Sequence, residues 1–258
     1  MSVNSYLSGL ASELVLSGTE KRSISTSIET LKRRLDYYFI RGEIEESFIF
    51  GSYTRDTILP RKYDEDSDID VMIVFDNPNR YKPQTFLSWL KRFAEERYQT
   101  SEIYQSSPTI VLELDHIKFE LVPAYKELSI STSYKIPDGP SQWQLTTPRE
   151  DDDKLIQCNK ANDYLIKPVV RLIKLWNIKK NNRNDKSFLI ERKIADWFYY
   201  HCNNYTDYLK ESLRSIRTHS NYTNIENAME GIDEALEYEE RTMPYSALEK
   251  IKEIFPES

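Results

Sequence analysis

The most constraining feature of this sequence is the segment 48–75. A short apolar run ends at Gly51-Ser52, a polar loop follows, and an alternating run of polar and apolar residues then opens with Asp68 and Asp70. In a β-strand, side chains two positions apart point to the same face of the sheet. The alternation therefore predicts a strand that places the two carboxylates together on one face and turns the apolar residues between and after them towards a core.

This pair of carboxylates predicts a site for metal and phosphate. Two like charges held together repel each other unless a cation lies between them, and an all-oxygen ligand set suits Mg²⁺ or Mn²⁺ bound with substrate phosphates. The alternative is a solvated acidic turn that leads into an ordinary strand. Gly51 and Ser52 favour the metal site, because a residue without a Cβ lets the backbone approach a ligand, and the hydroxyl and N–H groups beside it can bind phosphate oxygens.

The same segment resembles the signature of the polymerase β-like nucleotidyltransferase superfamily, in which Gly-Ser precedes Asp-x-Asp on a neighbouring strand. The run Gly-Ser-Tyr-Thr-Arg-Asp-Thr at 51–57 and the run Ser-Asp-Ile-Asp-Val at 67–71 carry this resemblance. They are most similar to the branch that holds the CD-NTases (cGAS/DncV-like synthases of cyclic oligonucleotides), the oligoadenylate synthases and the archaeal CCA-adding enzymes. The loop between the two runs contains an additional stretch, Lys62 to Asp66.

A third carboxylate follows from the resemblance. The segment 119–125 is similar to the family motif Asp-φ-φ-Pro-Ala, where φ is apolar, with Glu120 in place of the commoner Asp. The alternative is an exposed strand glutamate, but the two upstream aspartates favour a metal ligand. The resemblance implies that Asp68 and Asp70 bridge two metal ions and that Glu120 holds only the ion at the attacking hydroxyl.

Three cations form a stripe in the second half of the chain. Lys167, Arg171 and Lys174 fall at i, i+4 and i+7 of a predicted helix, which places them on one side beside the apolar face. Such a stripe is usually solvated. The segment 168–177, however, resembles the family segment whose lysine holds the triphosphate of the donor nucleotide, which implies this role for Lys174 and makes Arg171 a weaker candidate.

A serine at a second helix start is the remaining candidate. The segment 186–191 resembles the family pattern Ser-φ-φ-φ-Glu, in which a Ser hydroxyl near the helix N-terminus meets donor phosphate, a place where free N–H groups and the helix dipole favour anions. Ser187 is the matching residue. An ordinary N-cap role for Ser187 is equally supported.

Periodicity predicts the elements around these motifs. An apolar stripe predicts a long helix over 20–41, and Asp115-His116 predicts a tight hairpin. Pro168 either kinks its helix or opens the second part of it. The other predicted elements are strands over 48–52, 69–75, 102–105, 109–114 and 117–122, and helices over 84–98, 160–177 and 245–255.

The fold class expected from these patterns and the resemblance is α+β. Residues 1–148 are expected to form a polymerase β-like nucleotidyltransferase palm, a mixed sheet with flanking helices and an N-terminal long helix. Residues 149–258 are expected to form a C-terminal helical lobe that closes the nucleotide cleft. The turn-rich connection before the lobe has room for a short extra hairpin.

Charge and composition limit the partners. The formal net charge is −7 and there is no long Lys/Arg tract, so nucleic acid is not expected to be required, although the composition leaves room for a local basic groove. We expect no membrane span, since there is no run of about 18 apolar residues, and no secretory signal. Two distant cysteines without metal-ligand spacing, Cys158 and Cys202, agree with a cytoplasmic setting.

The resemblance implies a reaction and a product. A ribose hydroxyl would attack the α-phosphorus of a bound NTP in line, pyrophosphate would leave, and two Mg²⁺ or Mn²⁺ ions would be the cofactors. The implied product is a cyclic di- or trinucleotide second messenger for antiviral (CBASS-type) signalling, with a downstream effector or a regulatory protein as partner. Two alternatives stay open: nucleotidyl transfer to an RNA end or a protein, and a catalytically silent nucleotide- or RNA-binding module. Fold alone does not choose among them.

Overall fold

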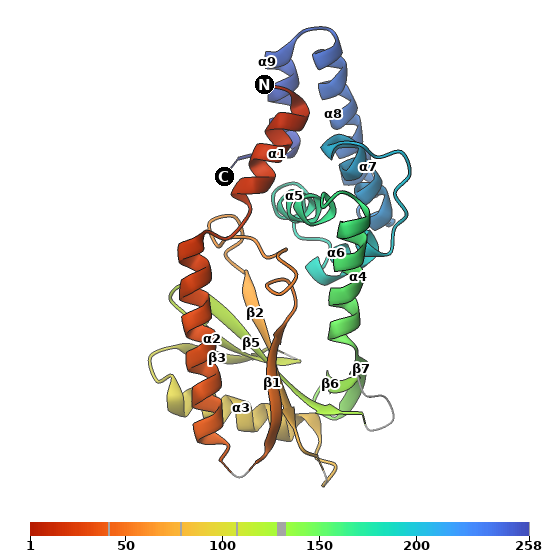
Figure 1. Cartoon of the computed structure of the whole chain (residues 1–258). Helices are drawn as coiled ribbons and strands as arrows, with labels where there is room; N and C mark the ends of the chain where they lie inside the picture. The colour runs from red at the N-terminus through yellow and green to blue at the C-terminus, as the bar shows by residue number, and fades with distance from the viewer. Residues whose placement is uncertain (41, 78, 107, 128–132, 258) are drawn as a thin grey trace. The chain divides into compact units, whose positions relative to one another are not determined.

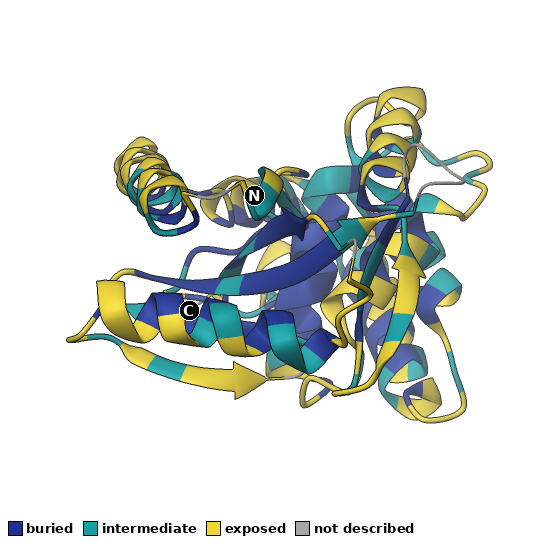
Figure 2. Cartoon of the chain, turned by 90° about the horizontal axis from the view of Figure 1, so that it is seen from below, coloured by how far each residue is buried: buried dark blue, intermediate teal, exposed yellow. Residues whose placement is uncertain are grey.

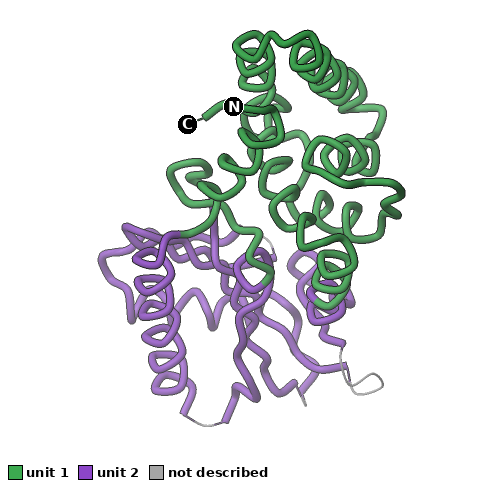
Figure 3. The backbone as a smooth tube through the Cα atoms, turned by 45° about the horizontal axis from the view of Figure 1, so that its top comes forward, with its two compact units in different colours: residues 1–16, 55–65, 153–258 green, residues 17–54, 66–152 purple. Residues whose placement is uncertain are grey.

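The computed structural model describes residues 1–40, 42–77, 79–106, 108–127 and 133–257. The chain divides into two compact units, each built from segments that are separated in the sequence (Figure 3). The sheet unit contains residues 17–54 and 66–152, and the helical unit contains residues 1–16, 55–65 and 153–258. Residues 1–16 and 55–65, which we expected with the palm, thus pack with the helical unit.

The sheet unit contains a mixed sheet of seven strands within the described residues. The strand order is β1-β2-β5-β4-β3; β6 pairs with β5, and β7 pairs with β6 (Figure 1). β2 and β5 run parallel, and the other pairs are antiparallel. The strands are β1 (Ile44–Phe50), β2 (Asp68–Phe75), β3 (Glu102–Ser106), β4 (Thr109–Leu114), β5 (Ile117–Lys126), β6 (Tyr134–Asp138) and β7 (Gln142–Thr146).

Two helices complete the core of the sheet unit. They are α2 (Gly18–Tyr38), which starts at a capping box made by Ser17 and Glu20, and α3 (Pro83–Arg97). α3 packs on strands of the sheet, and the ring of Phe75 in β2 stacks on Phe86 of α3 at 4.8 Å between centroids. The face of β2 that contains Phe75 is therefore the face that the helix covers.

The pleat of β2 separates its apolar residues from its carboxylates. Ile69, Val71 and Ile73 are fully buried, as the alternation predicts, and Figure 2 shows buried residues concentrated along the central strands. Asp68 and Asp70 lie on the opposite face and are half-buried. On that face the sheet also has a small apolar cluster, formed by Met72, Val74, Ala124 and Tyr134. Along this face of β2, the side chains are thus acidic at Asp68 and Asp70 and apolar at Met72 and Val74.

The helical unit is built around α5, which packs against α1, α6 and α7 and contains the fully buried Trp176. α8 and α9 pack on each other. The helices are α1 (Val3–Glu13), α4 (Pro148–Ala161), α5 (Ile166–Lys179), α6 (Ser187–Ala195), α7 (Tyr205–Ile216), α8 (Tyr222–Glu240) and α9 (Pro244–Ile254), of which α4 begins in the sheet unit. No helix in the described part of the chain has the length and apolar character that crossing a membrane requires.

Most predicted elements are confirmed, with ends that differ by a few residues. Leu114 pairs with Ile117 across the tight hairpin, and the turn-rich connection contains the extra hairpin β6–β7. The single helix predicted over 160–177 is wrong, because the chain breaks between α4 and α5, where Asp163 and Tyr164 both have positive φ angles. Pro168 lies in the first turn of α5, where a missing N–H costs no helical hydrogen bond. α1 was not predicted.

Candidate active site

The turn after β1 is fitted closely to the second aspartate. β1 runs antiparallel to β2 with Phe50 opposite Asp70, so the next residue, Gly51, comes beside the Asp70 side chain. Gly51 has φ +81°, and a Cβ added at this position would lie 2.0 Å from Asp70 Oδ2. The hydroxyl of Thr54 donates to the Gly51 carbonyl at 2.8 Å, and Ser52 is half-buried in the same turn. Glycine is needed here both for its backbone conformation and for the space.

The parallel pairing of β2 with β5 brings the third carboxylate alongside. Asp70 is the register partner of Glu120, and Asp68 is the register partner of Lys118. Register partners on neighbouring strands point to the same face of a sheet, so all three predicted carboxylates share the face that the Gly51 turn adjoins. Glu120 is half-buried like the two aspartates.

These oxygens fit a divalent cation in their chemistry, since hard ions such as Mg²⁺ and Mn²⁺ prefer carboxylate ligands. The side chains are not drawn together: over the described ranges, no three His, Cys, Asp or Glu side chains are grouped closely enough to hold a metal ion. The structure thus brings Asp68, Asp70 and Glu120 to one face and in register, without a closed cluster.

Lys118 is a further residue of this face, and it belongs to none of the motifs. It is 9% exposed and its ammonium lies 3.9 Å from Asp66. Alternation in β5 is the one signal for it, because alternation places Lys118 on the side of Glu120. A buried cation here partly balances the negative charge of the face.

In the helical unit, the basic stripe of α5 contacts the segment 55–57. The Lys167 ammonium lies 3.7 Å from the Asp56 carboxylate, the Arg171 guanidinium donates to the Asp56 carbonyl at 2.8 Å, and the Lys174 ammonium donates to the Thr57 carbonyl at 3.1 Å. Arg171 and Lys174 are 7% and 5% exposed, so the stripe is not an ordinary solvated surface. Burial lowers the pKa of Arg171, and its Nε is a buried group that has no hydrogen-bond partner among the described residues.

One carboxylate on α6 joins the stripe to that segment. Glu191 accepts hydrogen bonds from Arg55 Nε at 2.5 Å and from the Thr57 hydroxyl at 2.9 Å, and it is ion-paired with Lys174. Burial would raise the pKa of Glu191, but the positive charges and hydrogen bonds of Lys174 and Arg55 outweigh it and hold the pKa below its ordinary value. The carboxylate is therefore ionised at neutral pH. In the sequence, Glu191 stands out only as the last residue of the Ser187 pattern.

Ser187 is the first residue of α6 and is exposed. The N-cap position belongs to Lys186, which makes no side-chain capping bond, so the N-cap interpretation of Ser187 is wrong. Its predicted contact with donor phosphate stays a prediction.

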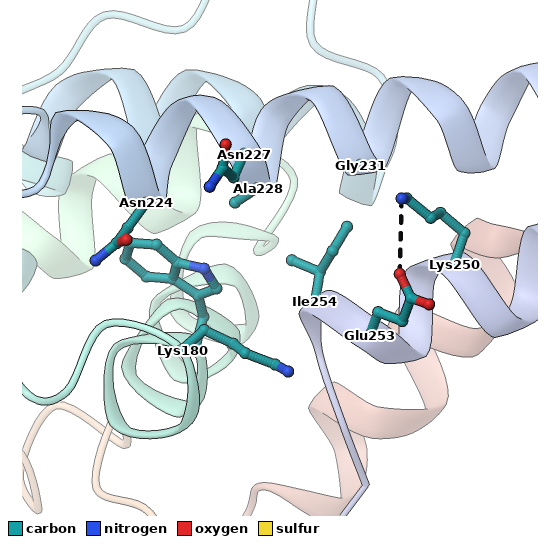
Figure 4. Close-up of a pocket in the computed structure, with 9 residues that line it drawn as sticks. Lys180, Asn224, Asn227, Ala228, Gly231, Lys250, Glu253 and Ile254 are labelled. Atoms are coloured by element: carbon teal, nitrogen blue, oxygen red, sulfur yellow. Dashed lines mark ion pairs between the residues drawn. The ribbon is translucent and has the colours of Figure 1, made fainter.

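The helical unit also contains a pocket of about 430 Å³, close to the lower end of the size range of small-molecule sites (Figure 4). Within it, the Lys250 ammonium lies 3.6 Å from the Glu253 carboxylate. None of the site residues predicted from the sequence lines this pocket. Its lining residues are Trp176, Lys180, Asn224, Asn227, Ala228, Gly231, Lys250, Glu253 and Ile254.

The family of the chain follows from comparison with known proteins. Residues 1–159 match the model of the Second Messenger Oligonucleotide or Dinucleotide Synthetase domain. This match covers more than half of the chain and includes the Gly51 turn and all three carboxylates. The chain therefore belongs to this family.

Two curated relatives and one solved protein agree with this assignment. A probable cyclic nucleotide synthase of Bacillus cereus is 34% identical over 109 residues, which cover 40% of this chain and 32% of that one. A cyclic AMP-AMP-AMP synthase of Acinetobacter is 24% identical over 218 residues, which cover 80% of this chain and 62% of that one. The chain thus matches less than two thirds of the length of either relative.

The solved protein is CdnC of Escherichia coli MS115-1, whose structures are described as a CdnC:HORMA-deltaN complex and as CdnC with ATP. It superimposes with a TM-score of 0.73 at 14% identity, over 96% of each chain. The fold is therefore that of the CD-NTases, an α+β fold with a mixed sheet, flanking helices and a helical C-terminal part.

Proposed function

We propose that this chain is a metal-dependent nucleotidyltransferase that joins NTPs into a cyclic di- or trinucleotide second messenger. The observation that carries the proposal is the parallel register of Asp70 with Glu120, with Asp68 on the same face and the Gly51 turn against Asp70. Membership of the synthetase family and the names of the two curated relatives support it.

In this proposal Asp68, Asp70 and Glu120 hold two divalent ions, Mg²⁺ or Mn²⁺. When bound, the ions would neutralise triphosphate charge and make the attacking ribose hydroxyl more acidic. The hydroxyl forms a bond to the α-phosphorus of the donor NTP, and the bond to pyrophosphate breaks. Backbone N–H groups of the Gly51 turn and the Ser52 hydroxyl would bind phosphate oxygens, and the absence of a Cβ at Gly51 leaves room for the Asp70 carboxylate beside them.

The helical unit offers further groups for donor phosphates. Ser187 is exposed and begins α6, a helix of nine residues. Free N–H groups at a helix N-terminus favour anions. Lys174 has three N–H groups, and the structure gives its ammonium two acceptors, Glu191 and the Thr57 carbonyl. We propose that Ser187, Lys174 and, more weakly, Arg171 contribute to donor binding.

The proposed partners follow from the relatives. ATP is the first substrate to test, because one relative is named a cyclic AMP-AMP-AMP synthase and CdnC was solved with ATP. A regulatory protein is a further proposal, supported by the CdnC:HORMA-deltaN complex. An antiviral (CBASS-type) effector would respond to the product.

The experiment is to incubate the purified protein with each NTP combination and Mg²⁺ or Mn²⁺, followed by mass analysis. We expect products that resist phosphatase, since ring closure leaves no terminal phosphate. Asp70→Asn serves as the inactive control. If label from α-phosphate-labelled NTP is transferred only after an RNA or protein acceptor is added, the cyclic product is wrong and the transferase alternative replaces it.

A further inference from the structure

Glu191 and two cations form a buried charge cluster in the helical unit. Glu191 is 4% exposed, and its two cationic partners, Arg55 and Lys174, are 6% and 5% exposed. A buried ion pair needs all its partners, because removal of one leaves an uncompensated charge in a medium of low dielectric. Two cations share this carboxylate, so its charge affects both.

The cluster acts on one particular segment of the chain. Arg55 and Thr57 both donate to Glu191, and Asp56 between them has a positive φ angle of 56°. This conformation is unfavourable for a residue other than glycine and persists where surrounding contacts hold it. Glu191 is thus one of the groups that hold residues 55–57, together with Arg171 and Lys167 at Asp56 and Lys174 at Thr57.

The same segment continues directly from the turn beside Asp70. Arg55 follows Thr54, whose hydroxyl closes the turn onto the Gly51 carbonyl. The chain from Gly51 to Thr57 contains two left-handed residues, Gly51 and Asp56. The segment that Glu191 contacts is therefore the direct continuation of this turn in the sequence.

We infer that Glu191 is a positioning residue for nucleotide binding: its charge holds Arg55, Thr57 and Lys174 in place, and so orders the Lys174 ammonium and the segment 55–57 beside it. This inference rests on the proposed function only in that the ligand is an NTP. It assigns Glu191 no contact with the substrate.

The chain offers a matched pair of variants for the test. Thr57→Val removes the hydroxyl that donates to Glu191 at 2.9 Å, and Tyr63→Phe removes a hydroxyl that donates to Glu13 at 2.9 Å. Both hydroxyls belong to the segment 55–65 and both accepting groups are carboxylates of the helical unit. Only the first pair involves the Glu191 cluster. Glu191→Gln is the direct variant, nearly isosteric and uncharged.

The measurement is the affinity of the full chain for a non-hydrolysable ATP analogue with Mg²⁺, by calorimetry, together with the midpoint of thermal unfolding. We expect Glu191→Gln to weaken binding about tenfold, the effect of losing one hydrogen bond to a charged group. Thr57→Val should weaken binding less, and Tyr63→Phe should bind as the wild type even if its unfolding midpoint falls.

Three outcomes would overturn the inference. Wild-type affinity in folded Glu191→Gln would show that the charge does not position the site, and equal losses in Thr57→Val and Tyr63→Phe would show a general loss of stability. Tighter binding in Glu191→Gln would show that Glu191 competes with phosphate for Lys174. If Glu191→Gln does not fold, the comparison of Thr57→Val with Tyr63→Phe still tests the inference. A wild type that binds the analogue but makes no cyclic product would instead count against the proposed function.

Discussion

Replacement of Gly51 by alanine tests the candidate site most directly. An added Cβ would lie 2.0 Å from Asp70 Oδ2, whereas real Cβ contacts essentially never fall below 3.0 Å. The carboxylate or the turn must therefore move by about 1 Å, and a displacement of that size at a reacting centre can cost about a hundredfold in rate. The positive φ angle adds a conformational cost of about 1–2 kcal/mol.

Gly139→Ala is the control variant, because it carries the conformational cost of a positive φ angle without a steric clash. Gly139 lies in the same sheet unit with φ +74°, and nothing lies within 4 Å of an added Cβ. Gly139→Ala should therefore lose a similar amount of stability from the left-handed conformation and keep its activity.

The assay is NTP turnover with Mg²⁺ at saturating nucleotide, with urea unfolding measured on the same samples. We expect both variants to lose stability and only Gly51→Ala to lose turnover. If Gly51→Ala turned over NTPs as fast as Gly139→Ala, the close approach of the turn to Asp70 would have no part in the reaction.

Three further predictions follow from the site. Asp68→Asn and Asp70→Asn should each abolish nucleotidyl transfer with an unchanged circular dichroism spectrum, because losing a metal-bridging charge costs several kcal/mol in the transition state; near wild-type rates would contradict the assignment. Lys174→Ala should weaken NTP binding and lower stability, whereas Lys180→Ala, an exposed position after α5, should change neither, as calorimetry and melting would show. Since the pKa of Glu191 is held below its ordinary 4.5, its charge contributes stability above that value, and the contribution is lost as the pH falls through the lower folded pKa. The difference in unfolding free energy between wild type and Glu191→Gln should thus be constant near neutral pH and shrink below pH 4.5; a constant difference in acid would refute it.

The placement of Asp68 and Asp70 could be predicted from the sequence, because it depends only on the alternation of neighbouring residues in one strand. The period of two places Asp68 and Asp70 on one face whatever the rest of the chain does. The register of Asp70 with Glu120 is different in kind, since two parallel strands can slide by pairs of residues without changing the pattern of either. Only the resemblance indicated that Glu120 belongs with them.

Other features had a weak signal or none in the sequence. The break between α4 and α5 has neither glycine nor proline; Asp163 is a residue type that tolerates the left-handed conformation, but Tyr164, which also adopts it, is not. The spacing of Lys167, Arg171 and Lys174 shows that they share a helix side, but it does not show what covers that side. That covering segment, 55–57, comes from more than a hundred residues earlier in the chain.

The burial of the basic stripe on α5 also bears on which molecule accepts the nucleotidyl group. Polynucleotide binding depends on exposed cations that each neutralise a phosphate, and the chain has a formal net charge of −7. Arg171 and Lys174 are buried against residues 55–57, and Lys167 lies beside Asp56, so the stripe is not an open row of cations that could follow a polynucleotide backbone, whereas one triphosphate needs only a single contact such as the one proposed for Lys174. The surface that these residues offer to an RNA backbone is therefore less basic than the sequence alone indicates. A mononucleotide acceptor, which needs few phosphate contacts, suits such a chain better, and this favours the cyclic product over transfer to an RNA end.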